Sequence, residues 1–311
     1  MNRPKKNIPP IHDFDLKLLR VFKIVVESNG LAAAEETLAI GRSTISKHVS
    51  DLEIRMDMKL CERGRAGFKV TPYGKIVYEG IIELFDSLDQ FRSKVTVQKN
   101  LLIGSVSLWV MDNTHLELGN PVARAITTYK DRPGSVELKM NTTDPESVEE
   151  AIRIRHANIG ITISNNSLPG LVYQKIGVES TSLYCTNQSL IHGKSESEIV
   201  QNDLMNQVDF VLPAYLRDGP VLKRFHKDSN GVALHVDAKL QLILSGHYVG
   251  ILPDHVAAPW VVKGDLFKID YHEAEGENTL FVVYRSDNNN IATVAALIED
   301  IQQSYLLSYN D

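Results

Sequence analysis

Residues 29–56 decide the fold of the N-terminal part of the chain, and they read NGLAAAEETLAIGRSTISKHVSDLEIRM. The Asn-Gly pair ends a preceding helix, which residues 14–27 predict by repeating apolar side chains at three- and four-residue steps. The alanine-rich run 31–38 predicts a short second helix, and a tight connection at 39–41 leads into a third helix from about Arg42 to Met56. Helix, short helix, turn and helix form a helix-turn-helix arrangement.

The third helix has an apolar inner face, formed by Ile45, Val49 and Leu52, and a polar outer face. A recognition helix reads base edges in the major groove of DNA with residues near its N-terminus. The outer residues that we predict to contact DNA are Arg42, Ser43, Thr44, Ser46, Lys47 and His48. Arg42 is suited to a forked contact with a guanine. The alternative is a polar face that contacts only solvent.

Residues 60–70 form two short extended runs around a tip rich in glycine and arginine, which predicts a β-hairpin wing. Three basic residues lie on or beside the tip: Arg63, Arg65 and Lys69. We expect them to contact phosphates, which position a protein on DNA without specifying a sequence. The winged domain spans 14–72, and the preceding residues 1–13 are predicted to be a flexible basic arm.

A long helix is predicted over residues 73–99, because Thr71 is a good N-cap and Pro72 a good first helical residue. Apolar residues recur along it at alternating steps of four and three: Val77, Ile81, Leu84, Leu88, Phe91 and Val95. Such a seam predicts pairing with the same helix of a second copy, so we interpret this helix as a dimerisation linker. The alternative is a helix packed on its own domain.

Residues 100–311 alternate strand and helix patterns, which predicts an α/β domain of two lobes with a cleft between them. Lobe I takes about 100–164 and 268–311, and lobe II takes about 165–267. The predicted strands are 102–110, 136–140, 159–163, 181–185, 209–212, 234–236, 249–252 and 280–285, and the predicted helices are 114–129, 145–155, 220–227, 237–245 and 291–307.

Charge is divided unequally along the chain. The 311 residues have a formal net charge of −6, but residues 1–99 hold 17 Lys and Arg against 13 Asp and Glu, and the remainder holds 16 against 26. A basic N-terminal part suits a polyanion, and an acidic remainder suits another partner. No apolar run reaches the roughly 18 residues of a membrane span, and the N-terminus has prolines instead of the apolar core of a signal peptide, so we expect a cytoplasmic protein without membrane contact.

Residues 14–74 resemble the N-terminal domain of the LysR-type transcriptional regulators. The matching segments are Leu16 to Phe22, the alanine-rich second helix, residues 43–53, Leu60 to Arg63, and Thr71 to Gly74. The rest of the chain follows the layout of that family, with residues 242–253 the clearest match. The resemblance implies an all-α winged helix-turn-helix, a dimerising linker helix and a two-lobed α/β domain like the type 2 periplasmic binding proteins.

The resemblance also implies a function. Family members are sequence-specific transcriptional regulators that bind double-stranded DNA, so we expect a homodimer or homotetramer controlled by a small-molecule effector between the two lobes. RNA polymerase is a further expected partner if the protein is an activator. We expect no cofactor, no metal ion and no catalytic residue.

Four departures from the family pattern concern the DNA-binding part. Cys61 stands where the family usually has phenylalanine, Ala32 where it has a Ser or Thr helix cap, and Glu35 where it has alanine. The Ser-Gln-Pro that usually opens the recognition helix is Gly41-Arg42-Ser43 here, so the turn is retained but the residues offered to bases are changed.

The family layout implies that loops after the strands line the effector cleft. The residues it selects are Val110, Met111, Asp112, Asn113, Thr142, Thr162, Ser164, Tyr215, His247 and Val249. Asn113 and Thr114 are predicted to start a helix whose backbone N–H groups could receive an anion, whereas Asp112 opposes a purely anionic ligand. His247 is open to the alternative of a structural histidine.

Three other functions compete with this reading. An enzyme is not supported, because the chain lacks the Gly-x-Ser-x-Gly, Gly-x-Gly-x-x-Gly, phosphate-loop and His-Glu-x-x-His patterns. A solute-binding module does not account for the helix-turn-helix. A thiol-oxidation-sensing regulator of the same fold rests on Cys61 and Cys185, which lie in different domains and are the only two cysteines.

Overall fold

The computed structural model describes residues 10–64, 67–97, 101–114, 119–213 and 231–308. The chain divides into two compact units, Met1–Phe91 and Arg92–Asp311. Among the described helices, none combines the length and the apolar character that a bilayer crossing requires.

The first unit is a winged helix-turn-helix, as predicted. Its three helices are α1 (Asp13–Glu27), α2 (Ala34–Leu38) and α3 (Arg42–Met56). Helix α2 is shorter than expected, because residues 31–33 form a turn before it. The apolar faces of the three helices meet in one hydrophobic cluster, in which Leu18, Phe22 and Val49 are fully buried.

The wing and the start of the long helix also follow the prediction. Strands β1 (Cys61–Gly64) and β2 (Gly67–Val70) pair antiparallel, with Cys61 opposite Val70. Helix α4 (Pro72–Val97) follows, and the Thr71 hydroxyl accepts a hydrogen bond from the Gly74 amide at 3.0 Å, as an N-cap does. Residue 74 must be glycine, because a Cβ there would lie 2.0 Å from the Leu60 carbonyl oxygen.

The seam along α4 is divided between two environments. Ile81 is only 2% exposed and packs in the hydrophobic cluster of the first unit, with Val77 and Leu84 packed against the same cluster. Leu88, Phe91 and Val95 are 38%, 65% and 54% exposed. The first half of the seam therefore packs at least partly on the chain's own domain, and the pairing of α4 with a second copy stays a prediction.

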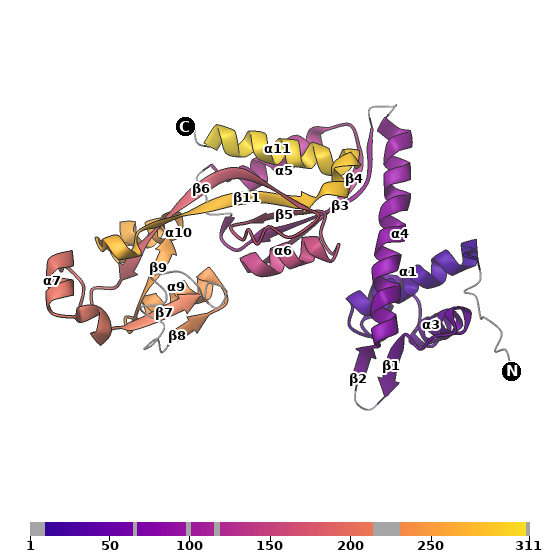
Figure 1. Cartoon of the computed structure of the whole chain (residues 1–311), viewed down its shortest axis with the longest axis horizontal. Coiled ribbons are helices and arrows are strands. Elements are labelled where there is room, and N and C mark those ends of the chain that lie inside the picture. Colours follow the sequence, from indigo (N-terminus) through magenta and orange to yellow (C-terminus); the bar gives the residue numbers. More distant parts are fainter. Residues whose placement is uncertain (1–9, 65–66, 98–100, 115–118, 214–230, 309–311) are drawn as a thin grey trace. The chain divides into compact units, whose positions relative to one another are not determined.

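Lobe I of the second unit is a sheet with helices on both faces. Strand β3 (Leu102–Met111) pairs parallel with β4 (Gly134–Thr143) and β5 (Ile159–Thr162), and β11 (Gly276–Arg285) pairs antiparallel with β5. Helices α5 (Pro121–Asp131) and α11 (Ala292–Ser308) lie on one face and α6 (Pro145–Arg153) on the other (Figure 1). The elements of lobe I are β3 (Leu102–Met111), α5 (Pro121–Asp131), β4 (Gly134–Thr143), α6 (Pro145–Arg153), β5 (Ile159–Thr162), β11 (Gly276–Arg285), η4 (Ser286–Asn290) and α11 (Ala292–Ser308).

Strand β6 (Leu171–Cys185) belongs to both lobes. It pairs with β11 from Leu171 to Thr181, then with β9 (Tyr248–Pro253) and β10 (Phe267–Ile269) over its last residues. The described strands of the second unit thus form one sheet in the order β4-β3-β5-β11-β6-β9-β7-β8, in which β7 is Asp209–Pro213 and β8 is Gly231–Ala233, with β10 beside β6.

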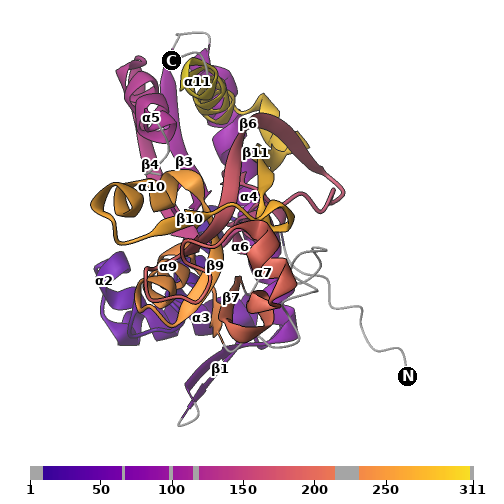
Figure 2. The same ribbon diagram turned by 90° about the vertical axis from the view of Figure 1, so that its left-hand side faces the viewer.

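Lobe II surrounds the far end of β6, where α7, α9 and α10 lie around β7 and β9 (Figure 2). Its elements are α7 (Glu196–Gln201), η2 (Leu204–Gln207), β7 (Asp209–Pro213), β8 (Gly231–Ala233), α9 (Val236–Leu244), β9 (Tyr248–Pro253), α10 (Asp254–Lys263), β10 (Phe267–Ile269) and η3 (His272–Ala274). Ile269, Tyr271 and Ala274 pack in the core of lobe II, so the return to lobe I comes later than the expected residue 268.

Three further predictions about the second unit need comment. The strand expected at 234–236 is wrong, because the strand is Gly231–Ala233 and Val236 is already the first residue of α9. The helix expected from residue 114 is described only from Pro121 onward as α5, and the helix expected at 220–227 lies outside the described residues. Helices α7 and α10 were not anticipated.

Candidate functional site

The outer face of α3 offers polar side chains at its N-terminal end. Ile45, Val49 and Leu52 are fully buried on the inner face. Arg42, Ser43, Thr44 and Lys47 are exposed, and Ser46 and His48 are half-buried. The predicted division between a core face and a reading face is therefore present, with four of the six predicted residues open to a ligand.

Helix α3 begins without a side-chain cap of its own, because its N-cap residue is Gly41. The carboxylate of Glu35, on α2, takes that place: its Oε1 accepts a hydrogen bond from the Arg42 amide at 2.5 Å. The bond joins the two helices of the motif at the point where the reading face starts.

Glu53 ties the wing to α3. This buried carboxylate accepts hydrogen bonds from the Leu60 amide at 2.9 Å and the Cys61 amide at 3.3 Å, and from the Lys59 ammonium at 2.8 Å. Burial by itself would raise the pKa of Glu53, but the bonds from Lys59, Leu60 and Cys61 outweigh it and hold the pKa below its ordinary value. Glu53 is therefore ionised in the folded domain at neutral pH.

Arg63 is engaged within the domain. Its Nη1 donates to the Ser46 hydroxyl at 2.9 Å and to the Ser46 carbonyl at 3.3 Å, and its Nη2 donates to Glu53 at 3.3 Å. The guanidinium thus joins β1 to α3 instead of extending from the wing toward solvent as expected. Of the other two predicted wing contacts, Lys69 is exposed, and Arg65 lies outside the described residues.

Several residues predicted to line the effector cleft lie in hydrophobic cores. Val110 and Met111 pack in the core of lobe I, and Val249 packs in the core of lobe II. Thr162 is fully buried, and its hydroxyl donates to the Pro145 carbonyl at 2.9 Å. These four side chains are buried because inward positions of a strand that leads to a cleft are filled by the core beneath it, and their contact with an effector stays a prediction.

The remaining predicted residues have mixed surroundings. The Ser164 hydroxyl donates to Glu149 at 2.7 Å. Thr142 and His247 are exposed, and Tyr215 lies outside the described residues.

Asp112 joins the two lobes. It follows β3 in lobe I, and its Oδ2 accepts from the amide of Val236, the first residue of α9 in lobe II, at 2.5 Å. His235 Nδ1 lies 3.7 Å from the same oxygen. A carboxylate at a helix N-terminus is favoured by the helix dipole, so this contact favours one arrangement of the lobes.

Two further buried charged residues, Glu179 and Lys239, interact electrostatically with Asp112. Glu179, on β6, accepts from the Asn278 side-chain amide at 2.8 Å, and Lys239, on α9, donates to the Ile251 carbonyl at 3.1 Å. Burial raises the pKa of Asp112 and, together with the Asp112 charge, that of Glu179. Burial lowers the pKa of Lys239 to about 8, although both carboxylates oppose that shift.

Asn113, next to Asp112, is a buried polar residue whose side chain has no partner among the described residues. It is 4% exposed, and neither side-chain amide atom has a hydrogen-bond partner in the described part of the chain. Its φ of 68° is in the left-handed region. The described start of α5 is at Pro121, where the Asn120 side chain accepts from the Ala123 amide, so Asn113 is not at the N-terminus of that helix as expected.

The family of this chain is decided by two matches that together cover most of its length. Residues 16–75 match the bacterial regulatory helix-turn-helix protein, lysR family, and residues 118–305 match the LysR substrate binding domain. The chain belongs to the LysR family of transcriptional regulators. It is therefore a DNA-binding regulator with a C-terminal effector-binding domain.

Individual relatives agree with this assignment. The HTH-type transcriptional activator BauR of Pseudomonas aeruginosa is 33% identical over 258 residues, which is 82% of this LysR-type chain and 84% of BauR. Among solved structures, full-length LysG from Corynebacterium glutamicum with bound effector Arg is 16% identical, with a TM-score of 0.54 over 94% of this chain and 98% of LysG. Full-length CbnR complexed with its target DNA is 17% identical, with a TM-score of 0.59 over 93% and 99%.

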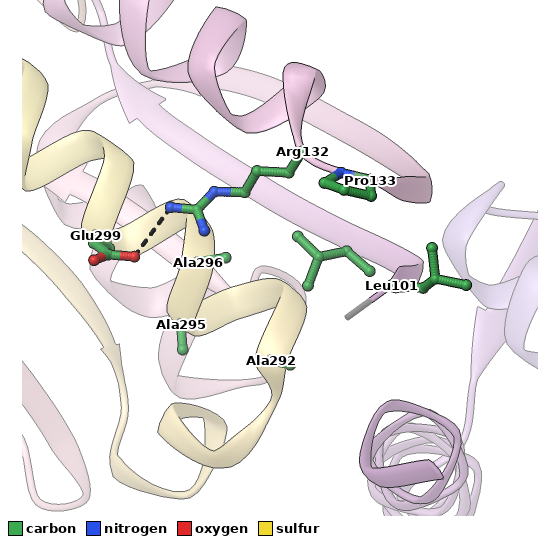
Figure 3. A pocket seen from close by; sticks show the side chains of 8 residues that line it. Leu101, Arg132, Pro133, Ala292, Ala295, Ala296 and Glu299 are labelled. Atoms are coloured by element: carbon green, nitrogen blue, oxygen red, sulfur yellow. Dashed lines mark hydrogen bonds and ion pairs between the residues drawn. The ribbon is translucent and has the colours of Figure 1, made fainter. Parts of the chain in front are cut away.

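One cavity of this LysR-type regulator lies away from all the predicted effector residues. It has a volume of about 550 Å³ and opens in lobe I between the starts of β3 and α11 and the end of α5 (Figure 3). Its charged lining residues are Arg132 and Glu299, which pair at 3.0 Å, and Arg132 also pairs with Asp300 at 2.7 Å. The lining residues are Leu101, Leu102, Arg132, Pro133, Ala292, Ala295, Ala296 and Glu299.

The two cysteines are poorly placed for redox sensing. Cys61 and Cys185 are both free and fully buried. Burial raises the pKa of Cys185 to about 11, and a thiol reacts as its thiolate, so this residue is held in its less reactive form. Within the described ranges, His, Cys, Asp and Glu side chains do not gather into a group that could hold a metal ion.

The structural roles of Glu35 and Glu53, which support α3 and the wing, were not predicted from the sequence. The helical periodicity does not place either residue among the predicted DNA contacts. Both carboxylates accept hydrogen bonds from backbone amides seven or more residues away in the sequence. A signal for Glu35 was present, since it departs from the family's alanine in the same chain in which glycine replaces the family's serine cap.

Proposed function

We propose that this LysR-type regulator binds a double-stranded operator with α3 in the major groove and the β1–β2 wing on the neighbouring backbone. The observation that supports it is the exposed N-terminal end of α3, where Arg42, Ser43, Thr44 and Lys47 stand over a fully buried inner face. Full-length CbnR, which has the same fold, was solved with its target DNA. Lys69 on the wing is proposed to contact phosphates, whereas Arg63 and Ser46 are proposed to hold the wing and α3 together.

The test is selection of binding sites from a randomised duplex library by the full-length protein. Arg42→Ala should lose preference at one base position of each half-site and bind the selected duplex about ten-fold or more weakly, because a forked arginine contact discriminates against the wrong base. Lys139→Ala, which removes an exposed cation of lobe I, is the matched control and should leave the preference unchanged. An Arg42→Ala protein with the wild-type preference would remove this role.

Oligomeric assembly is the second part of the proposal. Leu88, Phe91 and Val95 form an exposed apolar stripe on α4 that a second copy of α4 would cover. A homodimer or homotetramer built in this way presents paired α3 helices to the half-sites of a palindromic operator.

Such a regulator acts in the cytoplasm, where its DNA is, and contacts RNA polymerase if it activates transcription. It is proposed to have no catalytic activity.

The third part concerns the effector, which we place at the junction of the lobes. Asn113 supports this position, because a buried amide without a partner is costly and a ligand would satisfy it. Asp112 supports it as well, since a ligand beside its contact with Val236 changes the relative stability of lobe arrangements. Transmission of that change through α4 to the half-sites would constitute the allosteric coupling.

The effector position is tested by thermal-shift measurements on the full-length protein against a metabolite library. A compound that binds at the junction should raise the Tm of the wild type and lose most of that effect with Asn113→Ala. Arg132→Ala, in the separate cavity of lobe I, is the matched control. If Arg132→Ala abolishes the shift and Asn113→Ala does not, the effector site is the cavity and the proposed position is wrong.

A further inference from the structure

Two departures from the LysR-type pattern meet at the start of the recognition helix. Gly41 stands at the N-cap of α3, where the family usually has the serine of Ser-Gln-Pro, and glycine has no side chain with which to accept from the first amides of the helix. Glu35 stands where the family usually has alanine. The serine cap is thus absent in a chain that has gained a carboxylate nearby.

The contacts at this end of α3 explain what the carboxylate does. The Gly41 carbonyl accepts from the amides of Thr44 at 2.9 Å and Ile45 at 3.1 Å, as in an ordinary first turn. The Arg42 amide precedes that pattern and has no intrahelical acceptor available to it. Glu35 Oε1 accepts from it at 2.5 Å, so the preceding helix satisfies the first amide of α3, whereas a serine at the N-cap would accept from the second or third.

The connection between the helices gives the bond a second effect. Ala39, at the end of α2, has φ 51° and ψ 34°, a left-handed conformation that is unfavourable for a residue with a Cβ. The Glu35–Arg42 hydrogen bond spans this connection and opposes a return of Ala39 to a more favourable backbone conformation. It therefore fixes the direction in which α3 leaves the turn, and with it the position of the Arg42 side chain.

We propose that Glu35 is a positioning residue for DNA reading, which replaces the missing serine cap and holds Arg42 in the register that contacts its base. The proposal rests on the proposed function of α3 as the recognition helix. Its carboxylate also occupies the positive end of the helix dipole and repels a phosphate from that end, so DNA meets the side chains of α3 and not its terminal amides.

The chain offers a matched set of variants. Glu35→Ala removes the cap and the charge, Glu35→Gln keeps a side-chain acceptor but removes the charge, and Glu35→Ala combined with Gly41→Ser restores a cap at the family's position. Glu36→Ala is the control, because Glu36 is an exposed carboxylate on the same helix and its removal changes the net charge equally.

The experiment uses the full-length protein and the duplex that the wild type selects from a randomised library. Glu35→Ala should bind this duplex about 3- to 10-fold more weakly than Glu36→Ala and lose preference at the same base position that Arg42→Ala affects. Glu35→Gln and the Glu35→Ala/Gly41→Ser double variant should recover that preference. Circular dichroism provides the folding control: a Glu35→Ala protein whose spectrum matches that of Glu36→Ala is folded, so its loss of preference is not a failure to fold.

Three outcomes would overturn the proposal. They are an unchanged base preference in Glu35→Ala, equal effects of Glu35→Ala and Glu36→Ala, and a double variant that folds but does not recover the preference. A wild-type protein that selects no sequence would instead contradict the proposed function of α3, so the two failures are distinguishable.

Discussion

Glu53 makes the stability of the winged domain depend on pH. The folded state binds the ionised carboxylate through four donors, including the amides of Leu60 and Cys61, and its pKa lies below the ordinary value of 4.5. Because the folded-state pKa is the lower one, the stabilisation is complete above the unfolded-state value and is lost as the pH falls through the folded-state value. The domain should therefore become less stable below about pH 5.

Glu53→Gln is expected to lower the free energy of unfolding of the winged domain at pH 7 by about 1–3 kcal/mol, since an amide cannot serve all of these donors. The loss should shrink as the pH falls toward 3, because the stabilisation by the ionised carboxylate decreases below the unfolded-state pKa of 4.5. Urea unfolding at pH 7 and at pH 3 measures both values. Glu62→Gln, on the exposed side of β1, is the control and should change neither. Equal losses at both pH values would contradict the role of the charge.

Single side chains mark the limit of what the sequence could predict at the site. The outward position of Arg42 and Lys47 follows from helical periodicity, which depends only on nearby residues. The engagement of Arg63 with Ser46 and Glu53 does not, because it joins residues that the wing brings back over α3. The local sequence predicts Arg63 as a cation beside the wing tip that is available to phosphates. In the folded domain its guanidinium is bonded to Ser46 and Glu53.

At the scale of the element, the first half of α4 packs in the core of the winged domain, and its second half carries the exposed apolar stripe Leu88, Phe91 and Val95. Leu88→Asp should break the oligomer, because a carboxylate in a covered apolar stripe would be buried without a partner. Its expected cost is several kcal/mol per interface, enough to shift a micromolar dimer to monomer. Analytical ultracentrifugation of the full-length protein at micromolar concentration measures the result.

Two variants make this prediction specific. Val262→Asp, at an exposed apolar position on α10, should leave the oligomer intact. Ile81→Asp should instead unfold the winged domain, because Ile81 packs in its core. A Leu88→Asp protein that sediments like the wild type would show that α4 is not the interface.

Elements were predictable where local residues determine them. Helix α3 has the predicted bounds, and Thr71 with Pro72 marks the start of α4, because caps and periodicity act within a few residues. The failure at Leu234–Val236 has a non-local cause: α9 begins at Val236, whose amide is satisfied by Asp112 from the other lobe. No pattern within residues 234–236 carries that information.

At the scale of the whole molecule, the −6 net charge combines parts of opposite sign, because residues 1–99 have four more basic than acidic residues and residues 100–311 have ten more acidic than basic ones. Charges beyond a Debye length, about 8 Å at physiological salt, are largely screened, so DNA at α3 should respond chiefly to the charges of the first unit that lie near that helix. The affinity of the full-length protein for its selected duplex should therefore fall steeply with salt, with a slope of log K against log salt of about −3 or steeper, from release of counterions.

Lys47→Ala should reduce the magnitude of the slope by about 1 if Lys47 contacts a phosphate, and Lys139→Ala should leave the slope unchanged. Fluorescence anisotropy between about 50 and 300 mM salt gives these slopes, and a flat dependence in the wild type would mean that the acidic second unit cancels the field of the first.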